Sequence, residues 1–485
     1  MHLLQPHLPT RRAFLKRSGQ LALTGSALPL ALNLAAIGEA AAFDATDYKA
    51  LVCVFLYGGN DYANTVVTYD DPSYDRYNSI RGGGPARTAG GIALAKADLT
   101  ATLLAPTTAL VDGLGQARQY ALHPSMSGLA NLFNAGHAAV QLNVGPLVMP
   151  LTRAQYSSAN RSLYPLPPQL FSHNDQQSIW QSSSPEGSTV GWGGNIGDLA
   201  LSSNGNATFT CMSVTGNAVF LSGDTALQYQ VSTSGAIRIT PATAATVYGS
   251  SAVSTAMSSL IQQSRAHKLE NEYNRVTRRA IKAETSVSAA LALTPPSTVF
   301  ASDSLAQQLK MVARLIKGQS VLGAKRQVFL VSQGGFDLHD NLIANQPALL
   351  DHVSAAMTAF YNATVEIGVA NKVTSFTASD FGRTLSSNGD GSDHGWGSHH
   401  LVVGGAVKGK AFYGSAPPVS VGNTSAPEDQ WHVGQGRLLP STSVDQYAAT
   451  LAKWFGVADS ELTGILPNIG HFGGAGYPVN LGFMA

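Results

Sequence analysis

The sequence predicts an α/β fold in which a mostly parallel central sheet is flanked by helices. Segments 50–56, 327–332 and 373–379 are short apolar runs, as expected for parallel strands that are buried on both faces. An acidic residue follows each run within a few positions. Segments with helical spacing lie between the runs, and such alternation is typical of a parallel sheet with helical crossovers.

Residues 1–42 have the order of an export signal. An arginine pair at 11–12 precedes an apolar run at 21–37, and small residues at 40–42 end the segment. Gly25 and Pro29 interrupt the run, which is shorter than the roughly 20 residues of a membrane-spanning helix. We therefore expect recognition by the twin-arginine export machinery and cleavage after Ala42. The mature chain would be periplasmic or secreted, without a stable membrane anchor.

The expected mature chain, residues 43–485, is nearly neutral. The whole sequence has 30 basic and 29 acidic residues, and removal of residues 1–42 takes away four basic residues and one acidic residue, which leaves a formal charge of −2. So few lysines and arginines offer no basic stripe for a phosphate backbone. The composition therefore argues against nucleic-acid binding.

The connections between the predicted strands contain helices. One is expected at 304–317, with Leu305, Leu309 and Val312 on one side, and another at 347–368, opening at Pro347. Segment 182–296 is rich in small polar residues and contains a long charged helical stretch at 255–291. We interpret it as a cap region inserted into one domain, 43–485. The charges on this stretch predict a solvated face, with an interaction surface as the alternative.

Both cysteines lie in apolar, strand-like runs. Cys53 is inside the first predicted strand, and Cys211 is inside a second strand-like segment, 208–212. Buried thiols that pack as small apolar groups are the favoured interpretation. A disulfide between them is the alternative in an oxidising compartment.

Acidic residues and histidines gather at the ends of the predicted strands, where parallel sheets bind their ligands. The candidate metal ligands are Asp61 after the first strand, Asp337 and His339 after the second, Asp380 after the third, and His394, His399 and His400 before a fourth at 400–405. Carboxylates and imidazoles from separate loops are typical donors to divalent metal ions. Two such ions would suit hydrolysis of a phosphate or sulfate ester, because they neutralise charge on the attacking and leaving oxygens.

Two further residues are candidates for catalysis. Ser172 lies at the start of a predicted helix, where a hydroxyl would be favoured as a nucleophile. A plain helix cap is the alternative for Ser172. Arg383 could clamp the oxygens of an ester or pair with a nearby carboxylate. Neither cysteine and no serine opens the pattern C/S-x-P-x-R of formylglycine sulfatases, so a phosphatase is favoured over such a sulfatase.

Motifs along nearly the whole chain resemble the domain of unknown function family 1501. They are the arginine pair with Phe14-Leu15-Lys16, Gly58-Gly59-Asn60-Asp61, Phe336-Asp337-Leu338-His339, Ser379-Asp380-Phe381-Gly382-Arg383, Asp393-His394-Gly395-Trp396 and Trp454-Phe455-Gly456. That family is grouped with the alkaline phosphatase and sulfatase superfamily. The resemblance implies a mostly parallel sheet with a two-metal site at its edge.

The resemblance also implies roles for the candidate residues. Asp61 and Asp380 would hold one ion, while Asp337 and His339 would hold the other with His399 or His400. Superfamily phosphatases usually have a histidine where this chain has Phe381, and His394 would replace that ligand. Ser172 would be the nucleophile by position alone.

The sequence therefore predicts an exported hydrolase of phosphate or sulfate esters that uses divalent metal ions, expected to be two ions of Zn, Mn, Fe or Ca. Its substrate would be a small or polymeric anionic ester. The alternative is an exported binding or surface-assembly protein that keeps the fold without turnover. That alternative is supported by Phe381 and by the undefined nucleophile.

Overall fold

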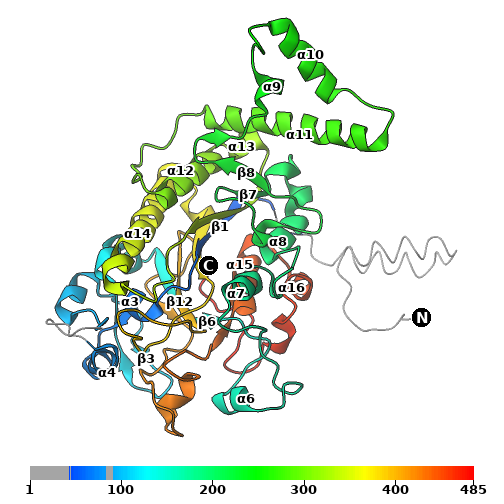
Figure 1. Ribbon diagram of the computed structural model, residues 1–485. Coiled ribbons are helices and arrows are strands. Elements are labelled where there is room, and N and C mark those ends of the chain that lie inside the picture. The colour runs from blue at the N-terminus through cyan, green and yellow to red at the C-terminus, as the bar shows by residue number, and fades with distance from the viewer. Residues whose placement is uncertain (1–42, 44, 83–90) are drawn as a thin grey trace, which may run out of the picture.

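The computed structural model describes residues 43, 45–82 and 91–485, and Figure 1 shows a central sheet with helices on both faces. The predicted signal segment, 1–42, lies outside the described residues. In spatial order the strands are β13 (Phe412–Tyr413), β6 (Ala138–Gly145), β12 (Ser398–Gly404), β11 (Val373–Ser379), β1 (Lys49–Leu56), β10 (Arg326–Gln333), β7 (Cys211–Ser213), β8 (Tyr229–Ser232) and β9 (Gly235–Ala236), with β14 (Thr442–Ser443) paired to β6.

The middle of the sheet is parallel, as predicted. Strand β1 pairs in parallel with both β10 and β11, and β7 continues the parallel order beyond β10. Strand β12, the fourth predicted strand, instead runs antiparallel to β11 and β6. Its first residues therefore lie at the edge of the sheet where β1, β10 and β11 end.

Helices cover both faces of the sheet. They are α5 (Ser127–Asn134), α12 (Ser304–Lys317), α13 (Gln319–Leu322) and α14 (Leu342–Glu366), with α7 (His173–Ser182), α8 (Trp192–Ala200), α15 (Val444–Phe455) and α16 (Asp459–Ile465) on the other side in Figure 1. The predicted helix 304–317 is confirmed. None of the helices in the described part of the chain has the length and hydropathy needed to span a bilayer.

The alternation of side chains along β1 joins the two layers. Val52 and Val54 belong to the apolar cluster beneath α12 and α14, whereas Leu51, Cys53 and Phe55 belong to the cluster beneath α8 and α15. The central strand is thus buried on both faces, as its sequence predicts. Cys53 and Cys211 are free, buried thiols, and β10 separates their strands, so the disulfide does not form.

Two helical boundaries differ from the sequence-based expectation. Helix α14 begins at Leu342 and contains Pro347, which was expected to open it. Because Leu342 is buried and Asn341 caps it in a left-handed conformation, the helix starts before the proline and loses one backbone hydrogen bond there. The expected stretch at 255–291 forms two helices, α10 (Ser251–Gln262) and α11 (Lys268–Leu291).

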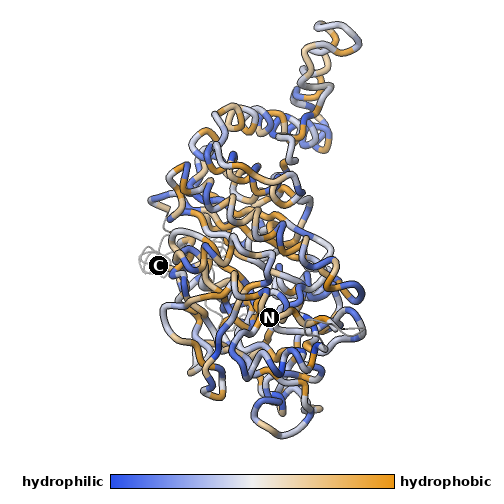
Figure 2. Tube along the Cα trace, turned by 90° about the vertical axis from the view of Figure 1, so that its left-hand side faces the viewer, coloured by the Kyte–Doolittle hydropathy of each residue, from blue (hydrophilic) through white to orange (hydrophobic). Residues whose placement is uncertain are grey.

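The expected cap region, 182–296, is divided in the structure. Its first part contains α8, strand β7 of the central sheet and the neighbouring strands β8 and β9. Its later part contains α9 (Thr240–Thr243), α10 and α11; the C-terminal half of α11 packs on the body, whereas α9 and α10 stand away from it in Figure 1 and Figure 2. We call residues 240–291 the arm.

Smaller elements complete the fold. They are α3 (Tyr62–Thr65), α4 (Asp71–Arg81), α6 (Arg153–Ser157) and two antiparallel strand pairs, β2 (Val66–Thr68) with β5 (Tyr120–Leu122) and β3 (Leu110–Val111) with β4 (Ala117–Arg118). Asp61 caps α3 by accepting hydrogen bonds from the backbone N–H groups of Ala63 and Asn64. Its other carboxylate oxygen lies 2.7 Å from Nη2 of Arg81, and both side chains are buried.

The Asp61–Arg81 pair generates a prediction about stability. Arg81 also donates to Asn64 Oδ1 and to the carbonyl of Leu385, so removal of Asp61 leaves a buried guanidinium without its counter-charge. We expect Asp61→Ala to lower the free energy of unfolding by about 3–5 kcal/mol, measured by urea denaturation. Asp71→Ala is the control, because Asp71 is 87% exposed in its pair with Lys96 and such pairs contribute about 0–1 kcal/mol. Equal stability of the two variants would contradict this role of Asp61.

Candidate metal centre

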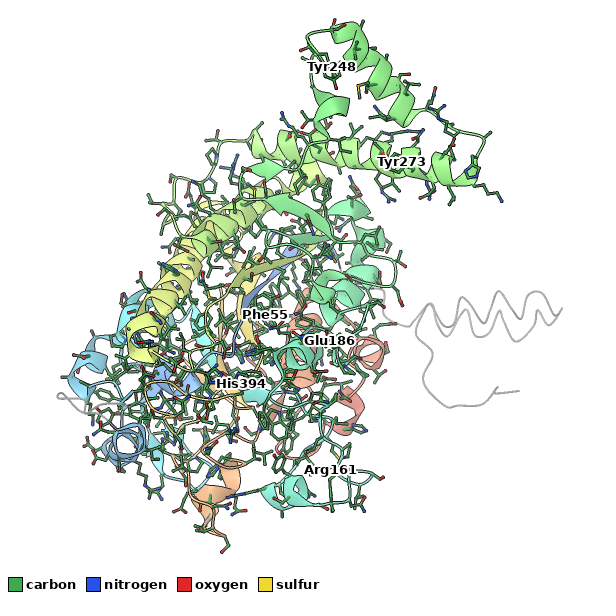
Figure 3. All side chains as sticks on the ribbon, in the orientation of Figure 1. Phe55, Arg161, Glu186, Tyr248, Tyr273 and His394 are labelled. Atoms are coloured by element: carbon green, nitrogen blue, oxygen red, sulfur yellow. The ribbon has the colours of Figure 1, made fainter. Side chains whose placement is uncertain are left out.

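Four side chains converge at the carboxyl edge of the central sheet. Asp337 and His339 lie in the loop after β10, His394 lies in the loop before β12, and His173 is the first residue of α7. Because β1, β10 and β11 are parallel, their final residues meet at one edge. In the view of Figure 3, His394 lies below Phe55 of β1, and its side chain is half-buried.

The nitrogen and oxygen atoms of this cluster lie within hydrogen-bonding distance or close to it. Nε2 of His339 is 3.1 Å and Nε2 of His394 is 3.2 Å from Oδ1 of Asp337. The same two nitrogens are 2.9 Å apart. Nε2 of His173 lies 3.4 Å from Oδ2 of Asp337. Ligand atoms of His173, Asp337 and His394 are mutually close enough to hold one ion.

Each of the three imidazoles is oriented through its other nitrogen. Nδ1 of His173 lies 2.7 Å from Oδ2 of Asp380, and Nδ1 of His394 lies 2.7 Å from the carbonyl oxygen of Phe171. Nδ1 of His339 lies 3.3 Å from Oδ1 of Asp393. Carbonyl and carboxylate oxygens accept hydrogen bonds, so each Nδ1 carries a proton and Nε2 is the nitrogen of each ring that can bind a metal ion. This arrangement is typical of metal-binding histidines.

Local charges shift the titration of these groups. The hydrogen bond to Asp380 raises the pKa of His173, and burial lowers the pKa of His394. Burial acts to raise the pKa of Asp337, but the hydrogen bond and charge of Arg383 outweigh it, so the pKa of Asp337 is lowered. The carboxylate is therefore ionised at neutral pH and available as a ligand.

Arg383 is fully buried beneath Asp337. Its Nη1 donates to Oδ1 of Asp337 at 3.0 Å and to the carbonyl of Gly58 at 2.9 Å. Its Nε and Nη2 donate to the carbonyl of Ser392. The guanidinium thus has protein partners on all of its nitrogens and orients Asp337, which matches the pairing alternative rather than an ester clamp.

Asp380 is also fully buried, and it contacts His173 on the side of the ring that faces away from Asp337. Its Oδ2 accepts from Nδ1 of His173 and from Nε2 of Gln177 at 2.8 Å, and both oxygens accept from the backbone N–H of Gly58 at 3.2 Å. Residues 173 and 177 are one turn apart on α7, so a single carboxylate docks the start of that helix. Asp380 thereby positions the imidazole of His173.

Ser172 is the residue before α7 and does not point its hydroxyl at the cluster. Its Oγ donates to Oδ2 of Asp175 at 2.9 Å, three residues along the helix. The neighbouring Phe171 has a φ of +76°, a conformation that costs energy for a residue with a side chain. This backbone conformation directs the carbonyl of Phe171 towards Nδ1 of His394.

The residues predicted for a second ion do not form a second cluster. Asp61 is engaged by Arg81 and by the start of α3, and the hydroxyl of Ser392, at 3.4 Å, links it towards Arg383. Phe381 is buried, and its ring packs against the rings of His173 and His394. These residues do not fit a second metal ion at Asp61 and Asp380.

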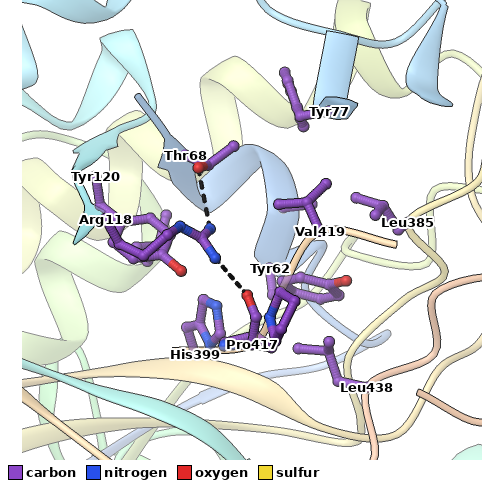
Figure 4. A pocket seen from close by; sticks show the side chains of 13 residues that line it. Tyr62, Thr68, Tyr77, Arg118, Tyr120, Leu385, His399, Pro417, Val419 and Leu438 are labelled. Carbon is purple, nitrogen blue, oxygen red and sulfur yellow. Dashed lines mark hydrogen bonds between the residues drawn. The ribbon is translucent and has the colours of Figure 1, made fainter. Parts of the chain in front are cut away.

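His399 and His400 lie on β12, away from the four converging donors. Nδ1 of His399 accepts from the backbone N–H of Asn143, and the ring lines a cavity of about 30 Å³ with Arg118 and Tyr120 (Figure 4). His400 hydrogen-bonds Thr377 Oγ1 and packs against Trp180. Burial lowers the pKa of each histidine to about 3, so both are neutral.

His173 is a candidate ligand that the sequence pattern does not single out. It directly follows Ser172 at the start of a helix, and its one signal is the i, i+4 spacing that puts His173 and Gln177 on one helical face. That spacing is a weak signal by itself. Only the docking of α7 against Asp380 brings the imidazole to the cluster.

Comparison with solved structures finds remote similarities. The chain is 10% identical to Ps i-CgsB in complex with k-i-k-neocarrahexaose, with a TM-score of 0.33, over 86% of this chain and 74% of the other. It is also 10% identical to the lipoteichoic acid synthase LtaP from Listeria monocytogenes, with a TM-score of 0.32 and the same coverages. These low TM-scores do not establish a shared fold.

A search of the curated proteins finds no match. A family match covers most of the sequence. The family is described as "Protein of unknown function (DUF1501)", and its match extends over residues 48–464, from the first strand of the sheet to α16. This match confirms the family that the motifs of the sequence indicate, and the chain belongs to the DUF1501 family.

Proposed function

We propose that this protein is an exported metal-dependent hydrolase of phosphate or sulfate esters, with one divalent ion bound by His173, Asp337, His339 and His394. One observation carries the proposal. Three imidazoles, each fixed through Nδ1 by a separate oxygen, present Nε2 to the same carboxylate. Such a donor set fits a divalent cation.

The chemistry of the donors favours some metals over others. Three imidazole nitrogens with one carboxylate suit Zn, Mn or Fe, whereas Ca prefers oxygen ligands. Four protein donors leave a position for substrate on an ion that accepts five or more ligands, as Zn does when its coordination expands. A bound ion supplies a Lewis acid for the ester oxygens and offsets the charge that develops on them.

The residues around the centre have distinct tasks in this proposal. Asp337 and His339 are the most exposed members, at 45% and 39%, so an ester reaches the centre from their side. His173 and His394 close the deeper side. Arg383 holds Asp337 in place and lowers the pKa of its carboxyl group. Asp380 fixes the orientation of the His173 ring through its hydrogen bond to Nδ1.

The non-catalytic alternative has support from two contacts. The hydroxyl of Ser172 is bonded to Asp175, and Arg383 has protein partners on every nitrogen. A binding or surface-assembly protein would hold the ion without turnover. Metal content and ester hydrolysis, measured together, distinguish the two functions.

The metal content of the purified mature chain tests the number of sites. We expect about one equivalent of Zn, Mn or Fe by plasma mass spectrometry, and a fall to below about a tenth in His394→Ala, because the variant removes an inward-facing donor. His267→Ala is the control, since His267 is exposed and lies in the arm. Two tightly bound equivalents, or full occupancy in His394→Ala, would contradict the single centre.

Ester hydrolysis tests catalysis and the role of Ser172. With p-nitrophenyl phosphate and p-nitrophenyl sulfate as probes, we expect Asp337→Asn to lower kcat/KM by about 10³-fold or more, because metal and ester both lose their anchor. Ser172→Ala is expected to change kcat/KM by less than about threefold, because its hydroxyl is held by Asp175. If Ser172→Ala lowered kcat/KM as much as Asp337→Asn does, this result would identify Ser172 as the nucleophile and contradict the expectation. Turnover of neither ester, with metal bound, would favour the non-catalytic alternative.

Export by the twin-arginine route remains part of the proposal, because residues 1–42 lie outside the described structure. Its support is the arginine pair at 11–12 ahead of the apolar run. Replacing both residues, Arg11→Lys with Arg12→Lys, is expected to leave the full-length chain in the cytoplasm, as measured by cell fractionation. Unchanged export of this variant would point to a different route.

A further inference from the structure

The arm carries an apolar stripe that is half buried and half exposed. Along α11, apolar residues recur at alternating spacings of four and three: Leu269, Tyr273, Val276, Ala280, Ala283, Val287 and Ala290. This spacing puts them on one face of the helix, as in a helix that packs along a partner helix. We call these residues the α11 stripe.

The inner half of the α11 stripe is covered by the body of the molecule. Ala283, Val287 and Ala290 are at most 4% exposed and belong to the apolar cluster that includes α12. Nη2 of Arg314 on α12 donates to the carbonyl of Leu291, which fixes the end of the helix. The inner half is therefore an ordinary packing seam.

The outer half of the same stripe has no partner among the described residues. Leu269 is 75%, Tyr273 is 68% and Val276 is 42% exposed. Figure 3 shows Tyr273 on α11 where the arm extends beyond the body, with Tyr248 at the far side of the arm. These three large apolar side chains lie on the same face of α11 as the buried residues Ala283, Val287 and Ala290. An exposed extension of a buried apolar face is typical of a helix that packs against another chain.

Helix α10 does not cover this stripe because it packs on a different face of α11. Nδ2 of Asn274 donates to the carbonyl of Gln263 at 2.7 Å, and Arg278 donates to the carbonyl of Gln262. Asn274 and Thr277 are buried by this contact. Helix α10 thus packs on one face of α11, and the outer half of the α11 stripe lies on a different face that α10 does not cover.

The charges beside the outer stripe are self-complementary. Glu272 and Arg279 are seven residues apart, so they lie on the same edge of the stripe. In an antiparallel pair of α11 helices that puts Tyr273 opposite Val276 across the two-fold axis, Leu269 is opposite Ala280. In that register Glu272 of each copy lies within two residues, about 3 Å along the helix, of Arg279 of the other. Glu272 also pairs with Arg275 of its own helix at 2.7 Å. A second copy of this chain therefore matches both the apolar and the charged pattern.

We propose that the outer half of the α11 stripe is an isologous interface, through which two copies of this chain associate by antiparallel packing of α11. The interacting length, residues 269–280, spans only about 18 Å of helix. Such a short contact buries less than a standard interface of roughly 1,600 Å². The dimer is accordingly weak and its formation depends on protein concentration.

Sedimentation velocity of the mature chain over a range of concentrations tests the interface. We expect a reversible monomer–dimer equilibrium whose Kd rises about tenfold or more in Tyr273→Asp, because a charge enters the apolar contact. Val299→Asp is the matched control, since Val299 is 87% exposed outside the arm and is expected to leave Kd unchanged. Circular dichroism and metal content, equal in all variants, exclude loss of folding as the cause.

Charge reversal provides a second, independent measurement. Glu272→Arg and Arg279→Glu are each expected to weaken the dimer, and the double variant is expected to restore it, because both reciprocal pairs re-form with opposite polarity. A wild-type chain that stays monomeric at every accessible concentration would overturn the proposal. So would a dimer that survives Tyr273→Asp, or a monomer whose α11 stripe instead binds vesicles of anionic lipid in a Tyr273-dependent way.

Discussion

Three imidazole nitrogens and one carboxylate lie within a few ångströms of one another, and loops and helices from separate parts of the chain meet at the carboxyl edge of the sheet to hold them there. The lone pairs of His339 and His394 are aimed at each other over 2.9 Å, which is favourable only with a proton or a cation between them. Each ring is anchored to a different element. The anchors follow β11, precede α7 and lie in the loop before β12, so the geometry depends on all three at once.

Buried arginines lie beside two of the carboxylates at which the sequence predicted metal ions. Arg81 already balances the charge of Asp61, and Arg383 contributes a positive charge directly beneath Asp337. A second ion near these carboxylates would have to displace a guanidinium that has several hydrogen bonds and no access to water. Uncompensated burial of such a charge is costly. At Asp61 the charge of a guanidinium thus stands where the sequence predicted a metal ion.

The sequence predicted the strands of the central sheet better than the side-chain contacts of the site. Continuous apolar runs identify β1, β10 and β11 because a strand buried on both faces tolerates few polar residues. Motif position alone could not distinguish Asp337, which points at the centre, from Asp380, which points at the back of an imidazole. That difference depends on where α7 docks. The sequence also could not predict that β12 is antiparallel to its neighbours, since an apolar run has the same pattern in a parallel and in an antiparallel strand.

Glycine at position 58 shows how loops from distant parts of the chain are held in register. Its N–H donates to Asp380 and its carbonyl accepts from Arg383. A Cβ at this position would lie 2.3 Å from the backbone nitrogen of Asp337, and φ is +115°, so only glycine fits without a shift of the chain. The loops after β1, β10 and β11 thus touch at one residue without a side chain. Gly58 therefore connects Asp380, the carboxylate that orients His173, with the loop that carries Asp337.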